Sequence, residues 1–324
     1  MKVKPIFFLA TVCFFSLFGC KDASKLESVI ANIPLDLEVE RFDRKFAEAD
    51  VKAIPQLKRS YPYLFPEQYP DSLWVAKKND TIQKELFNEV HVVFGDFKTE
   101  TADIASLFKH ITYYFPNFKV PKVVTLTSDV EYESRIILTD TLLLIGLDNY
   151  LGADHRFYRS FSAYIARQLD KRYLTSDIAG AFAKAVNAYP KNRTFLSKML
   201  YYGKELYLKD LLLPQTETYQ RINFTEEEYA WAVANESQIW RYFIERELLY
   251  STETKLEKRF LDPAPFSKFG LEEIDNESPG RIGRFMGWQI VRSYMEKNPD
   301  TPLVELLDLP ADELFKKSNY KPKK

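Results

Sequence analysis

The residues that most often bind zinc are scarce and scattered in this sequence. Its three histidines, His91, His110 and His155, are too far apart to form a His-Glu-x-x-His pair on one helix. There is also no Gly-x-Ser-x-Gly motif and no phosphate loop. A zinc site drawn from scattered histidines is left open, but His91 and His110 lie within helical patterns that favour structural or surface roles. We therefore expect no metal site, no cofactor and no catalytic activity.

Carboxylates are plentiful, and pairs of them can perform acid–base catalysis. The candidates in or near the C-terminal half are Glu205, Glu236, Glu245, Glu247, Asp275 and Glu277. Sequence alone places no two of them at a useful separation, and chance pairs are common among 46 acidic residues. We favour ordinary roles for these side chains and assign no catalytic residue.

Glycine and arginine recur in the segment "DNESPGRIGRFMGWQIVRSYM", in which Ser278-Pro279 is a plausible helix start. Its glycines share one helix face, although each costs a helix about 1 kcal/mol relative to alanine; they are Gly280, Gly283 and Gly287. Another element is therefore expected to approach closely. A neighbouring stripe consists of Arg281, Arg284, Trp288 and Arg292. It is either a cleft wall or partner surface facing an anionic group, or packing in which arginines pair with Glu or stack on Trp288. We favour packing.

Cys20 has the clearest expected chemistry. The chain begins "MKVKPIFFLATVCFFSLFGC", with two lysines followed by a charge-free run too short to span a bilayer, which takes about 20 residues. The ending Leu17 to Cys20 is typical of a bacterial lipobox. We expect residues 1–19 to be a signal peptide and Cys20 to carry fatty acyl chains. The protein would then be lipid-anchored in the cell envelope, with its globular part in the periplasm.

Hydrophobic periodicity predicts an α+β fold. The short runs "VPKVVTLTSD", "YESRIILTD" and "TLLLIGLD" indicate strands of one small sheet between about residues 120 and 148. Upstream, "LEVERFDRKFAEAD" predicts a strand or extended chain that turns into a helix. Apolar residues at helical spacing predict two helices. Ile82, Leu86 and Val90 share one side of the first, and the second has Ile104, Leu107, Phe108, Ile111 and Phe115 on one side. After Asp148 helices return, in "RFYRSFSAYIARQLDKRYL", "SDIAGAFAKAVNAYP", "RTFLSKMLYYGKELYLKDLLLP", "EEEYAWAVANESQIWRYFIERELLYS" and "GRIGRFMGWQIVRSYMEKN".

The helix expected over residues 193–213 has one apolar side, formed by Phe195, Leu196, Met199, Leu200, Gly203, Leu206 and Tyr207. Its other side is polar and carries Lys198, Lys204, Glu205 and Lys209. By pattern alone we therefore predict a core helix.

The composition is that of a globular chain, with 46% hydrophobic and 15% aromatic residues. The formal net charge is −1, and it becomes −3 when the two lysines of the leader are removed (−1 − 2). No broad cationic surface is expected, so nucleic acid is not a predicted partner. We expect residues 20–36 to hold the lipidated cysteine and a short polar tether, and residues 37–324 to form a single globular α+β domain.

Several long segments together resemble the gliding-motility lipoprotein family GldB of Bacteroidetes. They are "SKMLYYGKELYLKDLLLP", "IWRYFIERELLYST", "DPAPFSKF" and "NESPGRIGRFMGWQIVRSYM", behind the lipobox. The resemblance implies an envelope component needed for gliding, linked to type IX secretion, with other gliding-motility envelope proteins as partners.

The same resemblance extends distantly to zincin-type peptidases. The helix over 193–213 then corresponds to the zinc helix, but it lacks histidine and offers only Glu205 among the expected ligands. The resemblance therefore implies a zincin-like fold without its metal-binding motif, and a non-catalytic binding or assembly role. The alternative is a divergent metallopeptidase-like hydrolase of the envelope.

Overall fold

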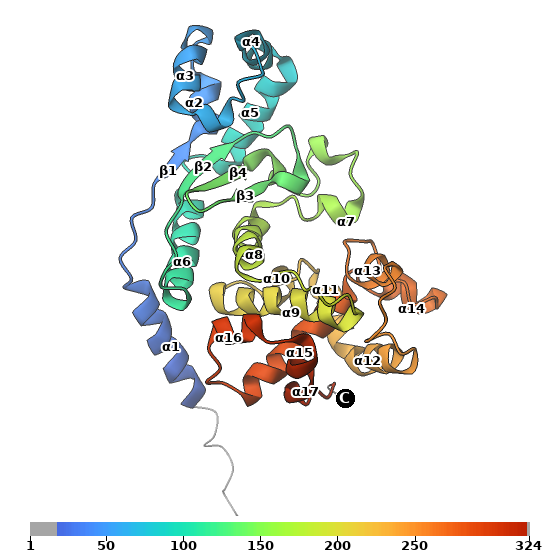
Figure 1. Cartoon of the computed structure of the whole chain (residues 1–324). Coiled ribbons are helices and arrows are strands. Elements are labelled where there is room, and N and C mark those ends of the chain that lie inside the picture. The colour runs from blue at the N-terminus through green and yellow to red at the C-terminus, as the bar shows by residue number, and fades with distance from the viewer. Residues whose placement is uncertain (1–17, 323–324) are drawn as a thin grey trace, which may run out of the picture.

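A small mixed sheet stands at the centre of the N-terminal half (Figure 1). In this computed structural model, which describes residues 18–322, the strand order is β1-β2-β4-β3. The strands are β1 (Val39–Arg41), β2 (Lys122–Leu126), β3 (Ile136–Leu138) and β4 (Leu142–Gly146). β1 and β4 flank β2 in parallel, and β3 pairs antiparallel with β4 at the edge. The predicted sheet is confirmed, and so is the upstream strand that leads into a helix.

Both faces of the sheet are covered. Val123, Leu143 and Ile145 belong to a large hydrophobic core with α5 (Thr81–Phe94), α6 (Lys98–Tyr114) and α8 (Leu174–Val186). Val124 packs on the opposite face against an aromatic cluster from α2 (Phe42–Glu48) and the segment that follows it. Alternate residues of a strand point to opposite faces, so β-branched and leucine residues in succession fill both cores.

The helices of the N-terminal half surround this sheet. α3 (Ile54–Ser60) and α4 (Asp71–Asn79) complete the group with α2 on the Val124 face. α5 contacts α2 and α4, while its buried side joins α6 in the core on the Val123 face. On α5 the predicted apolar side is only partly right, because Leu86 and Val90 are buried but Ile82 is 61% exposed. Ile82 lies in the first turn of the helix, away from the core.

Residues 21–36 differ from the expected tether. α1 (Phe18–Ala31) includes most of this segment and packs along α6. Ile30 is buried, and the Lys109 ammonium donates to the Ala31 carbonyl at 2.6 Å. The segment is polar overall but has enough apolar side chains on one face to dock. Residues 1–17 of the expected signal peptide lie outside the described residues.

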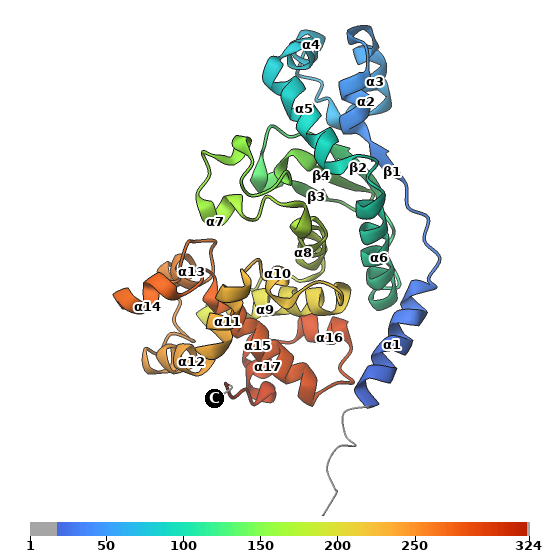
Figure 2. The same cartoon turned by 180° about the vertical axis from the view of Figure 1, so that it is seen from behind.

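The C-terminal half is helical, and α8 lies between it and the sheet (Figures 1 and 2). Its helices are α7 (Ala163–Ala166), α9 (Phe195–Leu212), α10 (Thr218–Arg221), α11 (Glu226–Ala234), α12 (Glu236–Glu245), α13 (Lys255–Phe260), α14 (Glu272–Glu277), α15 (Ile282–Lys297), α16 (Leu303–Asp308) and α17 (Ala311–Ser318). The expected helix over residues 156–174 is instead a series of short turns and α7. The one expected over residues 226–251 is divided at Asn235.

α9 and α15 cross at closely packed glycines. A Cβ added to Gly203 would lie 2.4 Å from the carbonyl group of Gly287, and one added to Gly287 would lie 2.0 Å from the Met199 carbonyl oxygen. Only glycine lets two helix backbones approach this closely. The close approach predicted from the glycine spacing is confirmed, although the helix begins at Ile282 and not at Ser278-Pro279.

The prediction that α9 is a core helix is confirmed, and even its polar side is buried. Lys198, Lys204, Glu205 and Lys209 are all buried. Their long side chains cross neighbouring elements: Lys198 pairs with Glu257, and Lys204 donates to the carbonyls of Leu307 and Leu309 at 2.9 and 2.8 Å. α9 is therefore surrounded on all sides. Within residues 18–322 no helix is both long enough and apolar enough to cross a membrane.

Candidate functional site

A cleft of about 640 Å³ opens between the sheet layer and the C-terminal helices. Its walls come from the edge strand β3, from α7 and α8, from α9, and from the residues at the start of α15. The lining holds six cationic side chains, Arg135, Lys184, Lys209, Arg221, Arg281 and Arg284. It holds four carboxylates, Glu133, Asp177, Glu205 and Asp262, which leaves a net charge of +2 (6 − 4). This excess favours an anionic ligand.

The sheet side of the cleft is fixed by Arg135, Asp177 and Tyr150. The Arg135 guanidinium donates through Nε to the Asp177 carboxylate at 2.7 Å, and the Tyr150 hydroxyl donates to the same oxygen at 3.0 Å. Tyr150 is fully buried, and this burial raises the pKa of its hydroxyl well above the ordinary value. Arg135 directly precedes β3 and Asp177 belongs to α8, so the contact holds the start of the edge strand against the helix.

The floor of the cleft is formed by Glu205 and Lys209 of α9. A Cβ added to Gly180 of α8 would lie 3.3 Å from Lys209 Nζ and 3.4 Å from Glu205 Oε1, so this glycine leaves room for both side chains. Lys209 is 5% exposed and Glu205 is 7% exposed. Burial lowers the pKa of Lys209, while the charge of Glu205 opposes that change.

Arg281 enters the cleft from the left-handed residue that precedes α15 (φ 63°). Its Nη2 donates to the Asn223 carbonyl at 3.0 Å, and it forms no ion pair with a carboxylate among the side chains that the structure describes. Burial, followed by the positive charges of Arg284 and Arg167, lowers the pKa of Arg281 to about 9. The guanidinium therefore remains cationic at neutral pH.

The expected arginine stripe divides between two environments. Arg281 and Arg284 line the cleft, where Arg284 stacks on Tyr202 with its guanidinium carbon 3.7 Å from the ring centre. Trp288 and Arg292 instead hold Asp210 of α9: the indole N–H donates at 2.8 Å, and Arg292 donates through Nε at 2.7 Å. Arg292 also lies 3.6 Å over the Trp288 ring. The packing interpretation thus describes Trp288 and Arg292, whereas Arg281 and Arg284 face the cleft.

The carboxylates singled out in the sequence do not assemble. Only Glu205 lines the cleft. Glu236 accepts from the Tyr320 hydroxyl, Asp275 accepts from the Phe269 and Gly270 amides, and Glu277 accepts from the Trp231 indole. Glu245 and Glu247 are exposed.

The histidines are equally dispersed. His110 is buried beside Ser106 and Glu27, His155 faces Glu89, and His91 is exposed on α5. Within the described part of the chain, no three His, Cys, Asp or Glu side chains gather where they could hold a metal ion. The residues of α9 that line the cleft therefore do not fit the zinc of a zincin-type site.

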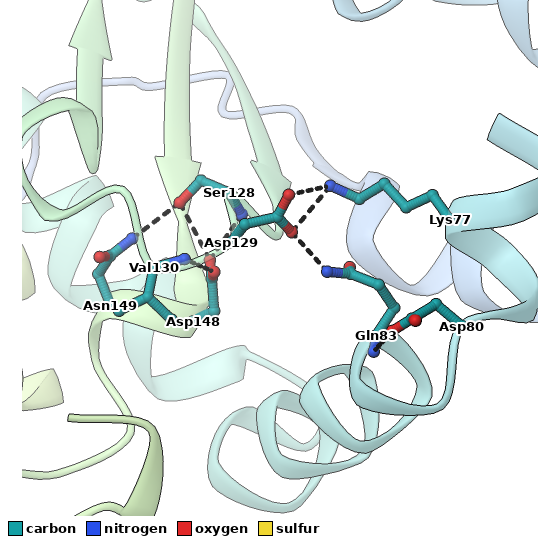
Figure 3. A network of polar contacts seen from close by, with 8 residues as sticks. All are labelled: Lys77, Asp80, Gln83, Ser128, Asp129, Val130, Asp148 and Asn149. Atoms are coloured by element: carbon teal, nitrogen blue, oxygen red, sulfur yellow. Dashed lines mark hydrogen bonds and ion pairs between the residues drawn. The ribbon is translucent and has the colours of Figure 1, made fainter. Parts of the chain in front are cut away.

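Sequence reasoning missed a polar network at the carboxyl ends of β2 and β4 (Figure 3). Asp148 is fully buried and accepts from the backbone amides of Ser128 at 2.8 Å and Val130 at 2.7 Å. Burial raises the pKa of this carboxyl. Asp129 points the other way and accepts from Lys77 at 2.8 Å and from Gln83 at 2.7 Å.

This network holds an unusual loop. Asp129 and Val130 both have φ near +60°, a region that β-branched residues rarely adopt. The hydrogen bonds to Asp148 fix the loop in that conformation, and the loop leads directly to Tyr132 and Arg135 of the cleft. A polar residue directly after the buried run "TLLLIGL" was the available signal. The network therefore positions the rim of the cleft.

A family described as gliding motility protein GldB matches residues 23–322, which is nearly the whole chain. The chain belongs to this family. No curated protein and no solved structure matches it. Family membership points to a component of gliding motility, and the family's lipoprotein label points to association with the cell envelope.

Proposed function

We propose that this member of the GldB family is a non-catalytic binding component of the gliding apparatus, anchored in the cell envelope through lipid on Cys20. Its globular part lies in the periplasm, and its partners are other gliding-motility envelope proteins linked to type IX secretion. The observation that carries the proposal is the charged cleft, in which buried cations of α9 and of the residue preceding α15 have no carboxylate partner among the described side chains.

Binding explains the cleft better than catalysis does. Its polar groups come from seven separate parts of the chain and converge on one cleft, which suits recognition. Burying a charge costs folding free energy. A ligand of opposite charge that binds in the cleft would offset this cost, which explains why the charges lie there. Among the described residues, the geometry of the cleft does not single out a pair of side chains that could act as the general acid and base of hydrolysis.

One observation favours the alternative of a divergent metallopeptidase-like hydrolase with a zincin-like fold. Glu205 of α9 lies in the cleft near the edge strand β3, and its Oε2 has no hydrogen-bond partner among the described residues. Incubating the purified protein with unfolded envelope proteins, with and without added zinc, tests this alternative. Cleavage that disappears in Glu205→Gln would support the hydrolase.

Blocking the cleft tests the binding role. Ala181 of α8 lines the cleft and is partly exposed, so Ala181→Trp would fill the opening with little change to the core. Ala105 of α6 is also partly exposed but lies outside the cleft, which makes Ala105→Trp the matched control. Partners are captured by chemical cross-linking in intact cells followed by affinity purification.

The expected result is that Ala181→Trp loses the cross-linked partners and stops gliding at normal protein abundance, while Ala105→Trp keeps both. Normal gliding and unchanged partners in Ala181→Trp would refute a role for the cleft in partner binding.

A further inference from the structure

The floor of the cleft carries two buried cations that lack an ion-pair partner. Arg281 is 7% exposed and Lys209 is 5% exposed. Neither forms an ion pair within the set of side chains that the structure describes, although Arg135, Arg221 and Arg292 nearby all do. Because buried charges without an ion-pair partner are unfavourable, an anion that enters the cleft gains from both.

The two cations are held close to each other by one short segment. Lys209 Nζ donates to the Arg221 carbonyl at 3.3 Å, and Arg281 Nη2 donates to the Asn223 carbonyl at 3.0 Å. These carbonyls are two residues apart, so they are separated by at most roughly 7 Å along the chain. The charge of Arg281 is also close enough to lower the pKa of Lys209. Both side chains also line the same cleft.

Two acceptors beside these cations also lack partners. Glu205 Oε2 and Asn223 Oδ1 are buried and accept no hydrogen bond from any residue within the described part of the chain. Both residues line the cleft. A ligand that satisfies the whole floor must therefore supply N–H or O–H donors next to its negative charge.

We propose that the Arg281–Lys209 floor binds a carboxylate carried by a peptide segment of a partner protein. The carboxylate lies between the guanidinium and the ammonium group, and the adjoining peptide N–H groups donate to Glu205 and Asn223. This inference rests on the proposed binding function and names its ligand chemistry. The carboxylate comes either from a chain end or from an Asp or Glu side chain.

The charges favour a carboxylate over a phosphate. Glu205 and Asp177 both lie on the cleft wall and would repel a dianion more strongly than a monoanion. A carboxylate followed by peptide amides supplies one negative charge together with donors, which is the combination that the floor lacks.

Binding of defined peptides to the lipidated protein in detergent tests the inference by calorimetry. The probes are pooled N-acetylated octapeptides in three forms: with a free C-terminal carboxylate, with an amidated C-terminus, and amidated with one internal aspartate. Inorganic phosphate is the fourth probe. We expect a carboxylate form to bind at least about tenfold more tightly than the amidated form that lacks aspartate. Preference for the free terminus assigns a chain end, and preference for the internal aspartate assigns a side chain.

Variants of the floor locate the binding site. Arg281→Gln and Lys209→Met should each abolish the preference for a carboxylate, while Lys184→Met, which removes an exposed cation of the same cleft, should keep it. Melting temperature identifies a variant that fails to fold. The comparison of peptides on the unaltered protein decides the question even if both floor variants unfold. Equal binding of all peptide forms, or tighter binding of phosphate, overturns the inference.

Gliding of the same variants separates this inference from the proposed function. If Ala181→Trp loses gliding and partners but the unaltered protein shows no preference for a carboxylate, the binding function is supported and the carboxylate ligand is refuted. A clear carboxylate preference in the unaltered protein, together with normal gliding of cells that carry Arg281→Gln, would support the ligand chemistry but contradict a role of this site in gliding.

Discussion

Replacing Gly287 with alanine should destabilise the crossing of α9 and α15. The added Cβ would lie 2.0 Å from the Met199 carbonyl oxygen and 2.5 Å from its carbonyl carbon. Favourable contacts between such atoms lie at about 3.5–4.0 Å. The atoms contacted belong to the backbone of α9, so they cannot rotate away as the end of a flexible side chain can. The two helices must separate, and Gly203, which packs against Gly287, is displaced with them.

The expected cost follows from this geometry. Inserting an extra methyl group into a packed core costs typically about 1–3 kcal/mol, and contact with backbone favours the upper end. Unfolding entropy is about 2.1 cal/mol/K per residue, or roughly 0.6 kcal/mol/K for about 300 residues. Alanine gains about 1 kcal/mol over glycine as a helix former, so the net loss of about 2 kcal/mol lowers the melting temperature by about 3 °C. Gly203→Ala should act on the same contact, so the double variant should cost less than the sum of the two.

Scanning calorimetry of purified protein measures the effect, with Gly180→Ala as the matched control. A Cβ at Gly180 meets only side-chain atoms of Lys209 and Glu205, at 3.3 to 3.4 Å, and these can move slightly. Alanine is also the better helix former by about 1 kcal/mol. Gly180→Ala should melt at or slightly above the wild-type temperature. If Gly287→Ala melts within about 1 °C of wild type, or if both variants fall equally, the close helix contact is not the reason for glycine.

Three further predictions follow from the anchor, the histidines and the buried lysines. Cys20→Ala should release the protein from membranes or leave a larger uncleaved precursor, and unchanged labelling by radioactive fatty acid would contradict lipid attachment at Cys20. The protein should purify without stoichiometric zinc; elemental analysis that finds one zinc per chain, lost on changing any histidine, would revive the peptidase alternative. Burial lowers the pKa of Lys204 to about 8, so the folded protein releases this proton before the unfolded chain does. Stability relative to Lys204→Met should therefore rise as the pH increases from about 8 to about 10.5, and denaturant titrations of both proteins that show a constant difference would contradict the shift.

Elements with a strong local period could be predicted from the sequence. The β-branched runs over residues 120–148 form three of the strands, and the segments that became α8, α9 and α15 were recognised from their spacing. The contact at Gly287 was predictable because glycine in a helix interior is unfavourable unless another backbone comes close. The weakly periodic segment over residues 156–174 was not, because its aromatic side chains pack from short turns as readily as from a helix.

The candidate site was much less predictable. Arg281 and Arg284 were identified as a cleft wall in one of two interpretations, but Lys209 and Glu205 were recognised only as the polar side of a core helix. Hydrophobic periodicity measures only how apolar each side of a helix is. A side rich in lysine is therefore not recognised as buried. Lysine stems can also pass through a packed interior when carbonyls of distant segments accept hydrogen bonds from their ammonium groups.

The sequence by itself determined the strongly periodic elements and the glycine crossing, and it predicts an anchor at Cys20, because each depends on neighbours within a few turns of the chain. The tertiary structure alone decided which charges are compensated. Asp210 receives Arg221 and Arg292, while Arg281 and Lys209 meet in a cleft without a carboxylate that pairs with them among the described side chains. That outcome depends on distances between segments far apart in the chain, and the energy of a buried charge is set by those distances and by the exclusion of water.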